Sequence, residues 1–395
     1  MGRVDAYAIM IGKLTPRLIT YAWMLSVCLA SVVGCVLVGT GRASSIAMAV
    51  LVGCTTLPVA APWLVRRIAS GDPLYLYFPI MLVAVTLRVI WDTGVAGLQF
   101  AAALVLICSI LLSGFAGRLL ARKRNVLLLL AILACAILII GWYASFPGLR
   151  QKNAVGGAVF YLLLLSGIVF LRDRFWLSAY LLSSAAVVVA IFDMRSIVIV
   201  CAIIVFAMYH PLGKSPRILF LAVVVMILGT IIVVSVMQTG AFDKYLQAYN
   251  SHFQRGLESG RDVIWPMVLD QASAAPYFGL GFDAGKFSFR DEEMSAHNQY
   301  LEILVQQGGV GVLLVALLLT IIANKASVSI RDDFCRQRFS GVFCGIVYAN
   351  NFEVQLFQNL FYIGLVQWLL IALTLYGEMP RTLGTRASSG GNSGA

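Results

Sequence analysis

Long apolar stretches constrain the fold of this chain more than any other feature of its sequence. A helix that crosses the hydrocarbon core of a bilayer needs roughly 20 consecutive apolar residues, and stretches of this kind recur along most of the 395 residues. Hydrophobic residues make up 60% of the chain and charged residues 12%, whereas a soluble domain has about half and about a quarter. The sequence therefore predicts an all-α polytopic membrane protein.

About 12 apolar stretches qualify as predicted transmembrane helices. They cover 18–39, 43–65, 74–94, 97–117, 125–145, 155–171, 175–192, 196–210, 217–238, 307–324, 340–351 and 357–377. The apolar stretch over 175–210 is divided at Asp193–Arg195, because one helix of 36 residues would be about 54 Å long and the hydrocarbon core is about 30 Å thick. The stretch over 340–377 is divided in the same way at 350–353. The first stretch is too long for a cleaved signal peptide and is interpreted as a retained span.

Lysine and arginine indicate the orientation, because short cytoplasmic loops carry an excess of both. With the N-terminus inside, the inner loops hold 19 of the 29 basic residues and the short outer loops hold four. Both termini are therefore predicted to be cytoplasmic, and the tail over 378–395, rich in Ser and Gly near its end, is predicted to be disordered. This asymmetry explains most of the net charge of +11, so the basic composition does not indicate nucleic acid.

One long polar segment, 238–306, separates nine predicted spans over 1–237 from three over 307–377. The predicted orientation places it outside, and it holds nine of the 18 acidic residues and two of the three histidines. A connector of this length is far longer than most and is typical of a functional loop. None of the eight cysteines lies in it, and the sequence has no CxxC pair, so we expect neither a structural disulfide nor a zinc site.

An ordered set of motifs fills the second half of this loop. Ser259-Gly260-Arg261 and Trp265 come first, Pro276-Tyr277-Phe278-Gly279-Leu280-Gly281-Phe282 follows, and Ala296-His297-Asn298-Gln299-Tyr300-Leu301-Glu302 leads to Gly308-Gly309-Val310-Gly311. Each motif alone is weak. Their order and spacing resemble those of the O-antigen ligase/polymerase superfamily of bacterial inner-membrane glycosyltransferases.

This resemblance implies a membrane glycosyltransferase C-like helical bundle with a periplasmic loop subdomain between helices 9 and 10. Members of the superfamily transfer a glycan from undecaprenyl diphosphate at the periplasmic face. The acceptor is the lipid A core for an O-antigen ligase, another lipid-linked repeat unit for a surface-polysaccharide polymerase, and a protein hydroxyl for related enzymes. The implied partners are this donor, the glycan or lipid A core acceptor, membrane lipids and other polysaccharide assembly proteins. No nucleotide sugar, cofactor or metal is implied.

A diphosphate leaving group needs cations, and arginine binds phosphate oxygens in a bidentate manner. Arg261 matches the first motif, and Arg255 lies six residues earlier. Arg195, at the turn between predicted spans seven and eight, resembles the family's arginine at this position; pairing with Asp193 is the structural alternative. Arg88 lies inside predicted span three, where a charge marks a functional site unless its long stem carries the guanidinium to the membrane surface.

His297 is the candidate general base, since an acceptor hydroxyl must lose a proton as it attacks the anomeric carbon. A role in positioning the acceptor or the diphosphate is equally compatible with the sequence. Asn298 is expected to orient the chain or a sugar hydroxyl. Direct attack by the acceptor predicts inversion, because the sequence offers no carboxylate pair for a glycosyl-enzyme intermediate and no DxD motif for a metal.

Two other functions compete with this one. A lipid-linked oligosaccharide transporter or flippase would place polar groups near the bilayer midplane, whereas these spans are largely uncharged. A peptidoglycan polymerase would also use undecaprenyl diphosphate, but the motif order does not resemble that family. Ligase and polymerase stay open, with a slight preference for polymerase because no lipid A core-binding feature is visible.

Overall fold

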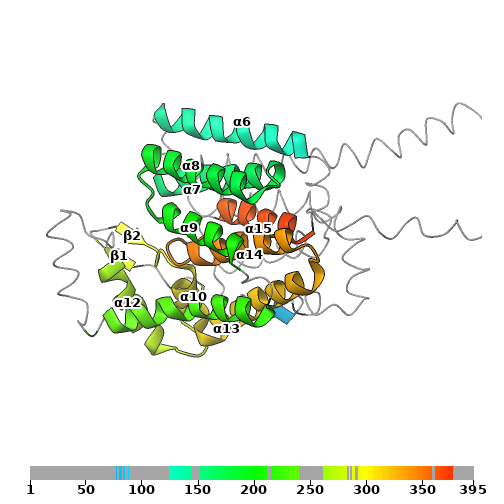
Figure 1. The fold of residues 1–395 in the computed structure, drawn as a ribbon. Coiled ribbons are helices and arrows are strands. Elements are labelled where there is room, and N and C mark those ends of the chain that lie inside the picture. The colour runs from blue at the N-terminus through cyan, green and yellow to red at the C-terminus, as the bar shows by residue number, and fades with distance from the viewer. Residues whose placement is uncertain are drawn as a thin grey trace, which may run out of the picture.

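A computed structural model describes residues 124–144, 152–210, 215–237, 239, 261–282, 284, 287–289, 292–357 and 361–376, together with six residues between Tyr77 and Arg88. The chain in these ranges is mainly helical (Figure 1). Its elements are α6 (Arg124–Tyr143), α7 (Lys152–Phe170), α8 (Arg174–Phe192), α9 (Ser196–Tyr209), α10 (Pro216–Met237), α12 (Arg261–Ala274), β1 (Phe287–Phe289), β2 (Glu292–Met294), α13 (Gln299–Ser329), α14 (Asp333–Ala349) and α15 (Phe361–Tyr376).

The helices pack into a bundle in which several are long and apolar enough to cross a membrane. Among the described residues, α6, α7, α8, α10 and α13 are long and apolar enough to cross a bilayer, and α9 and α15 are shorter apolar helices. The bounds of α6, α7, α8, α9 and α10 agree with the five apolar stretches predicted from 125–145 to 217–238. The predicted division at Asp193–Arg195 is the break between α8 and α9. The structure thus supports a polytopic membrane protein, while the first four predicted spans lie almost entirely outside the described residues.

Helix α7 lies at the centre of the bundle, and α6 and α10 lie at its edges. The apolar window of α7 is 78% buried, against 28% for that of α6 and 22% for that of α10. Figure 1 shows the helices in successive layers, in which α7 packs against α6, α8 and α15, and α14 packs against α9, α10 and α15. The exposed apolar faces of α6 and α10 are those expected to contact lipid.

Two glycines let α14 approach α9 closely. A Cβ atom at Gly341 would lie 2.7 Å from the carbonyl oxygen of Ile204, and one at Gly345 would lie 2.4 Å from the side chain of the same residue. Small residues four positions apart allow this kind of backbone contact between membrane helices. The contact fixes α14, whose last residue precedes the segment that carries Glu353.

The turn-rich motif over 276–281 packs into a kink of α13. Gly308 has φ 67° and ψ −167°, which interrupts the helix and frees backbone groups on both sides. The N–H groups of Leu280 and Gly281 donate to the carbonyls of Val305 and Gln306, at 2.7 and 3.0 Å. In return, the N–H of Gly309 donates to the carbonyl of Pro276 at 2.8 Å. Two of the predicted motifs therefore serve to join the loop subdomain to the bundle.

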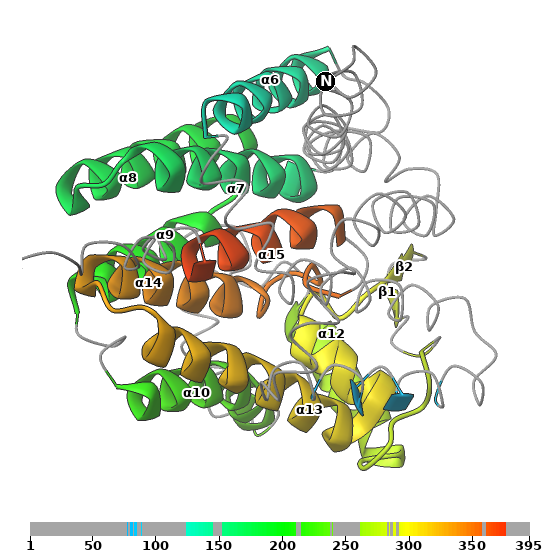
Figure 2. The same ribbon diagram turned by 90° about the vertical axis from the view of Figure 1, so that its right-hand side faces the viewer.

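The described part of the loop subdomain has its own small core. It lies at one end of the bundle, where Figure 2 shows α12 beside α13 and the β1–β2 hairpin next to them. Trp265 and Val268 of α12 pack with Phe287 of β1 and with Leu301 and Val305 of α13. The antiparallel hairpin pairs Phe287 with Met294. It was not expected from the sequence, because three residues per strand are too few to show an alternating pattern.

Two helices differ from the predicted spans. The helix predicted from 307 starts at Gln299, so the last part of the predicted loop is the first two turns of α13. The glycines over 308–311 mark the kink rather than the helix start. The short span predicted over 340–351 is part of α14, which starts at Asp333. The first turn of α14 is charged, so the apolar stretch in the sequence begins later than the helix does.

Candidate active site

A buried carboxylate contacts residues from three other segments at one end of the bundle. Glu353 lies in the segment that connects α14 to α15, and its side chain is 8% exposed. Its Oε2 lies 3.5 Å from Nδ1 of His297. Its Oε1 accepts a hydrogen bond of 3.1 Å from Nδ2 of Asn153, at the start of α7, and lies 3.9 Å from Nη2 of Arg261. We call these four residues the Glu353 cluster.

Arg261 is the first residue of α12 and is anchored on the segment that carries Glu353. Its Nη2 donates to the carbonyl of Phe352 at 2.8 Å, and its guanidinium carbon lies 5.9 Å from the centre of the Phe352 ring. Burial lowers the pKa of Arg261, and the neighbouring Glu353 carboxylate acts in the opposite direction. Arginine nevertheless stays charged at any physiological pH, so the cluster holds a desolvated, oriented cation.

The backbone of His297 adopts a left-handed conformation, with φ 48°. Such a conformation is uncommon for a residue other than glycine, although histidine adopts it more often than most. The neighbours hold it in place: the N–H of Ala296 donates to Oε2 of Glu302 at 3.0 Å, and Nε1 of Trp265 donates to the carbonyl of Ala296 at 2.9 Å. Strained residues persist where their surroundings fix them, and they gather at functional sites.

Asn298 begins α13 as its N-cap. Its Oδ1 accepts hydrogen bonds from the N–H groups of Tyr300 and Leu301, at 2.9 and 3.1 Å. An asparagine at this position satisfies backbone donors that the first helical turn leaves open. The predicted role in orienting the chain therefore has a structural counterpart, and it fixes the helix start directly after His297.

Buried amides support the segment that carries Glu353. Oδ1 of Asn350 accepts from the N–H of Leu356 at 3.1 Å, and its Nδ2 donates to Oε1 of Gln367 at 3.2 Å. Nε2 of Gln367 donates to Oε1 of Gln355 at 2.6 Å. The hydroxyl of Thr230 donates to Oδ1 of Asn351 at 2.6 Å. Satisfied networks of this kind in a low-dielectric interior rigidify the backbone that they hold.

Arg195 lies at the same end of the bundle as the Glu353 cluster. Its neighbour Met194 packs beside Gly157 of α7, as does Gln355 from the segment after α14. Nε of Arg195 lies 3.4 Å from Oδ1 of Asp193, and both side chains are well exposed, at 64% and 49%. The pairing given above as the structural alternative is thus present, in a weak, solvent-exposed form.

Arg88 and Arg255 are not placed at the cluster by the structure. Nη2 of Arg88 donates to the carbonyl of Gly279 at 3.1 Å, which ties it to the loop that packs into the α13 kink. Arg255 lies outside the described residues. The described residues contain no group of three or more His, Cys, Asp or Glu side chains able to hold a metal ion.

Glu353 and Asn153 are the two members of the cluster that the sequence does not identify. In the sequence, Glu353 stands out only as part of the polar interruption in the apolar stretch over 340–377. An acidic residue in such an interruption is itself a signal, because ionisable groups at membrane depth are costly and mark functional sites. The partners of Glu353, however, are 56, 92 and 200 residues away along the chain, and only the fold brings them together.

Comparison with known families supports the motif analysis. Residues 178–316 match the family model described as O-antigen ligase. The match covers 139 of the 395 residues, so the likeness to this family extends over about a third of the chain. The matched stretch begins in α8 and ends beyond the α13 kink, and it includes Arg195, Arg261 and His297. The match confirms the predicted resemblance to the O-antigen ligase/polymerase superfamily. None of the curated proteins compared with the chain matches it.

An O-antigen ligase domain implies glycosyl transfer of the ligase or polymerase type, with lipid-linked glycan and acceptor substrates in general. The Glu353 cluster contains groups suited to such a reaction. An imidazole can accept a proton near neutral pH, and a guanidinium can bind phosphate oxygens. A buried carboxylate that contacts both can orient them relative to each other.

Proposed function

We propose that this protein is an inner-membrane glycosyltransferase that moves a glycan from undecaprenyl diphosphate to an acceptor hydroxyl at the periplasmic face. The observation that carries the proposal is the contact of both His297 and Arg261 with Glu353. The domain match supports the type of reaction. The excess of Lys and Arg in the predicted inner loops supports the orientation, with N- and C-termini cytoplasmic and the 238–306 loop periplasmic.

In the proposed reaction, the acceptor hydroxyl attacks the anomeric carbon of the donor sugar. A bond forms between the acceptor oxygen and this carbon, while the bond from the carbon to the diphosphate oxygen breaks. His297 takes the hydroxyl proton, and undecaprenyl diphosphate leaves with the bonding electron pair. A single displacement inverts the configuration at the anomeric carbon. Because Nδ1 of His297 faces Glu353, Nε2 is the nitrogen assigned to the acceptor.

Arg261 stabilises the negative charge that grows on the departing diphosphate. Its side chain is 18% exposed, and a cation in such an environment acts more strongly than one in water and needs no reorganisation during the reaction. Arg195 is proposed as a second phosphate contact, since it is exposed at the same end of the bundle. Arg255, Arg88 and Asn298 stay predictions as contacts to the diphosphate or the sugar.

We propose that Glu353 is a positioning residue for both groups. A carboxylate beside an imidazole fixes its tautomer and stabilises the imidazolium that forms when the proton is taken. The other oxygen of the same carboxylate, Oε1, lies beside Arg261. The guanidinium of Arg261 is suited to stabilise the charge on the departing diphosphate. We therefore propose that the transfer needs no metal ion.

The acceptor decides between two activities of the same site. A surface-polysaccharide polymerase would extend a second lipid-linked repeat unit, and an O-antigen ligase would use the lipid A core. The test is to reconstitute the purified protein in liposomes with an undecaprenyl-diphosphate-linked glycan and to offer each acceptor separately. Release of undecaprenyl diphosphate with one acceptor and growth of that acceptor identify the activity. No release with any glycan or lipid acceptor contradicts the proposal.

A further inference from the structure

Two residues of the predicted motifs, Trp265 and Glu302, have no part in the proposed reaction, yet both bind the residue that precedes His297. This residue, Ala296, is fully buried, at 0% exposure. Nε1 of Trp265 donates to its carbonyl at 2.9 Å, and Oε2 of Glu302 accepts from its N–H at 3.0 Å. Side chains from two different helices thus hold both polar groups of one residue, an arrangement that we call the Ala296 clamp.

The clamp is buried, and its carboxylate is itself held in place. Trp265 is 9% exposed and Glu302 is 4% exposed. Oε1 of Glu302 accepts from Nε2 of Gln306 at 3.0 Å, and the same Nε2 donates to the carbonyl of Ala284 at 3.1 Å. A buried polar group that loses its partner is costly, because no water replaces the lost hydrogen bond. The clamp therefore resists movement of the peptide groups next to His297.

Helix α12 places the clamp in register with Arg261. Trp265 follows Arg261 by four residues in this helix, and residues four apart lie on the same face of a helix, with Cβ atoms about 5–6 Å apart. At one end of this turn, Arg261 binds the carbonyl of Phe352, next to Glu353. At the other end, Trp265 binds the residue before His297. One turn of α12, which lies beside α13 in Figure 2, thus links the proposed phosphate-binding cation to the proposed base.

The first turn of α13 fixes the other side of His297. The N–H of Gln299 donates to the carbonyl of Asn350 at 2.8 Å, and its Oε1 accepts from the N–H of Phe357 at 3.3 Å. These two partners lie on either side of Glu353 along the chain. His297 therefore stands between two fixed points, and such surroundings can hold a residue in an unfavourable left-handed conformation.

We propose that Trp265 and Glu302 are positioning residues for His297. They act through its backbone, and they hold its imidazole beside Glu353 and in register with Arg261. The inference rests on the proposed function of His297 as the base. A shift of the clamped peptide would turn the imidazole away from both groups, and a misplacement of about 1 Å in an active site can cost about a factor of 100 in rate.

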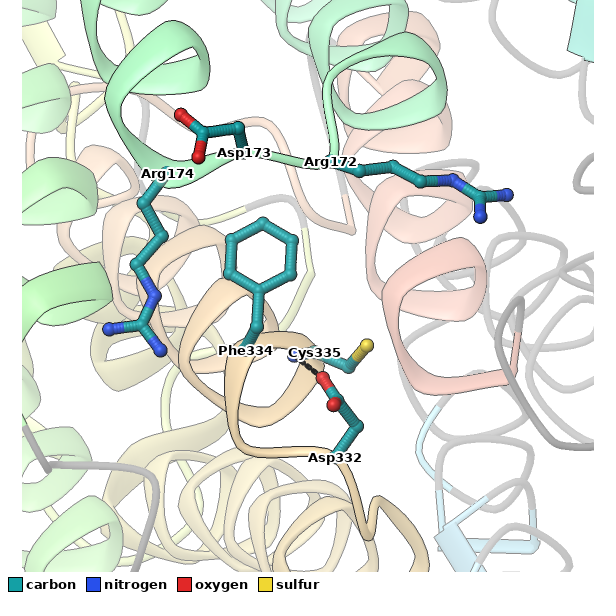
Figure 3. A pocket seen from close by; sticks show the side chains of 6 residues that line it. All are labelled: Arg172, Asp173, Arg174, Asp332, Phe334 and Cys335. Carbon is teal, nitrogen blue, oxygen red and sulfur yellow. Dashed lines mark hydrogen bonds between the residues drawn. The ribbon is translucent and has the colours of Figure 1, made fainter.

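The substitution Trp265→Phe tests one half of the clamp, because it removes the Nε1–H donor and keeps an aromatic ring in the loop core. In the reconstituted protein, kcat for release of undecaprenyl diphosphate should fall about three- to tenfold, and KM for the donor should change less than about twofold. Trp176→Phe is the matched control and should change neither. Trp176 is 64% exposed and lies two residues after Arg174, which Figure 3 shows at a cavity between α8 and α14.

The substitution Glu302→Met tests the other half, because it removes the acceptor and keeps a side chain of similar length. It should lower kcat about tenfold or more, since the buried N–H of Ala296 loses its partner. Glu302→Gln should retain more activity than Glu302→Met, because the amide oxygen can still accept from Ala296. Asp270→Met, at an exposed carboxylate on α12, is the control. Thermal unfolding in detergent verifies that each variant is folded, and Trp265→Phe carries the test if Glu302→Met is not.

Carbethoxylation by diethyl pyrocarbonate, measured for each histidine by mass spectrometry, reports the position of the imidazole without any turnover. The His297 side chain is 32% exposed. Released from its place beside Glu353, it should react about two- to tenfold faster in the folded Trp265→Phe and Glu302→Met variants than in the wild type. His210, which is exposed at the end of α9, is the internal reference and should react at the same rate in all of them.

The two measurements together decide the proposal. A lower kcat with an unchanged KM, together with faster labelling of His297, supports it. Unchanged labelling of His297 in either folded variant overturns it, and so does a wild-type kcat in either. A wild type that shows no transfer refutes the proposed function instead, and the labelling then still decides whether the clamp holds His297.

Discussion

Substitution of Glu353 by Gln tests the arrangement of the site, because it removes one charge and keeps the shape of the side chain. The amide oxygen can still accept the hydrogen bond from Asn153, and Arg261 keeps its hydrogen bond to the carbonyl of Phe352. It cannot stabilise the positive charge that forms on His297 when the acceptor proton is taken. We therefore expect kcat to fall strongly and KM for the lipid-linked donor to change little, since the lost interaction is made mainly in the transition state.

The magnitude follows from the distance between Nδ1 of His297 and Oε2 of Glu353, which is 3.5 Å. Two unit charges at that distance interact by about 4.7 kcal/mol at an effective dielectric constant near 20. The His297 side chain is 32% exposed, and doubling the dielectric constant for this exposure leaves about 2.4 kcal/mol. Each 1.36 kcal/mol is a factor of ten in rate, so the expected loss in kcat is about 50- to 3,000-fold.

The assay is release of undecaprenyl diphosphate by the reconstituted protein at saturating donor and acceptor. Asp270→Asn is the matched control, because Asp270 is an exposed carboxylate on α12, the helix that begins with Arg261. It should leave kcat and KM unchanged. A Glu353→Gln protein that unfolds at the wild-type temperature and turns over at more than about one fifth of the wild-type rate would refute the positioning role.

Four further predictions concern other parts of the molecule. Arg261→Lys should lower kcat at least tenfold in the same assay, because an ammonium group cannot reproduce the fork that binds Phe352 and a phosphate; a wild-type rate would contradict this. Gly308→Ala should destabilise the protein by more than about 2 kcal/mol in detergent unfolding, since its φ is 67° and a Cβ would lie 2.3 Å from the Tyr277 backbone, whereas Gly229→Ala, with nothing within 4 Å, is the neutral control. Hydrogen bonds from the thiol and N–H of Cys335 lower the pKa of Asp332 below 3.8, so its capping contribution is complete above that pH and is lost as the pH falls through the lowered pKa; Asp332→Ala should cost about 1 kcal/mol at pH 7 and progressively less below pH 3.8. In a Cys-free background, a single cysteine at Ser288 should react with an impermeant maleimide added from the periplasmic side, and labelling from the cytoplasmic side alone would reverse the topology.

The sequence predicted the helices of the bundle because lipid imposes a simple length rule on apolar stretches. The rule placed α7 and α8 within a few residues of their bounds. It failed where the helix ends are polar: α14 starts in a charged turn, and α13 starts in the motif that contains His297. The kink at Gly308 could not be foreseen either, since glycine also occurs within regular membrane helices.

The sequence also predicted two members of the Glu353 cluster, because His297 and Arg261 stand in motifs with a fixed order. It could not predict Glu353 or Asn153, since neither belongs to a motif and each is brought to the site by helix packing. The contact of Arg88 with Gly279 was also beyond sequence reasoning. Local order along the chain identifies residues that carry chemistry, whereas the groups that orient them depend on tertiary structure.

The most direct measurement of the proposed reaction is single-turnover transfer from an undecaprenyl-diphosphate-linked glycan by liposomes that contain the wild type or His297→Ala, each verified to be folded and inserted. The account predicts that the wild type releases undecaprenyl diphosphate and forms a product with inverted anomeric configuration, and that His297→Ala binds the donor but forms no detectable product. Product formation by His297→Ala at close to the wild-type rate would contradict the account.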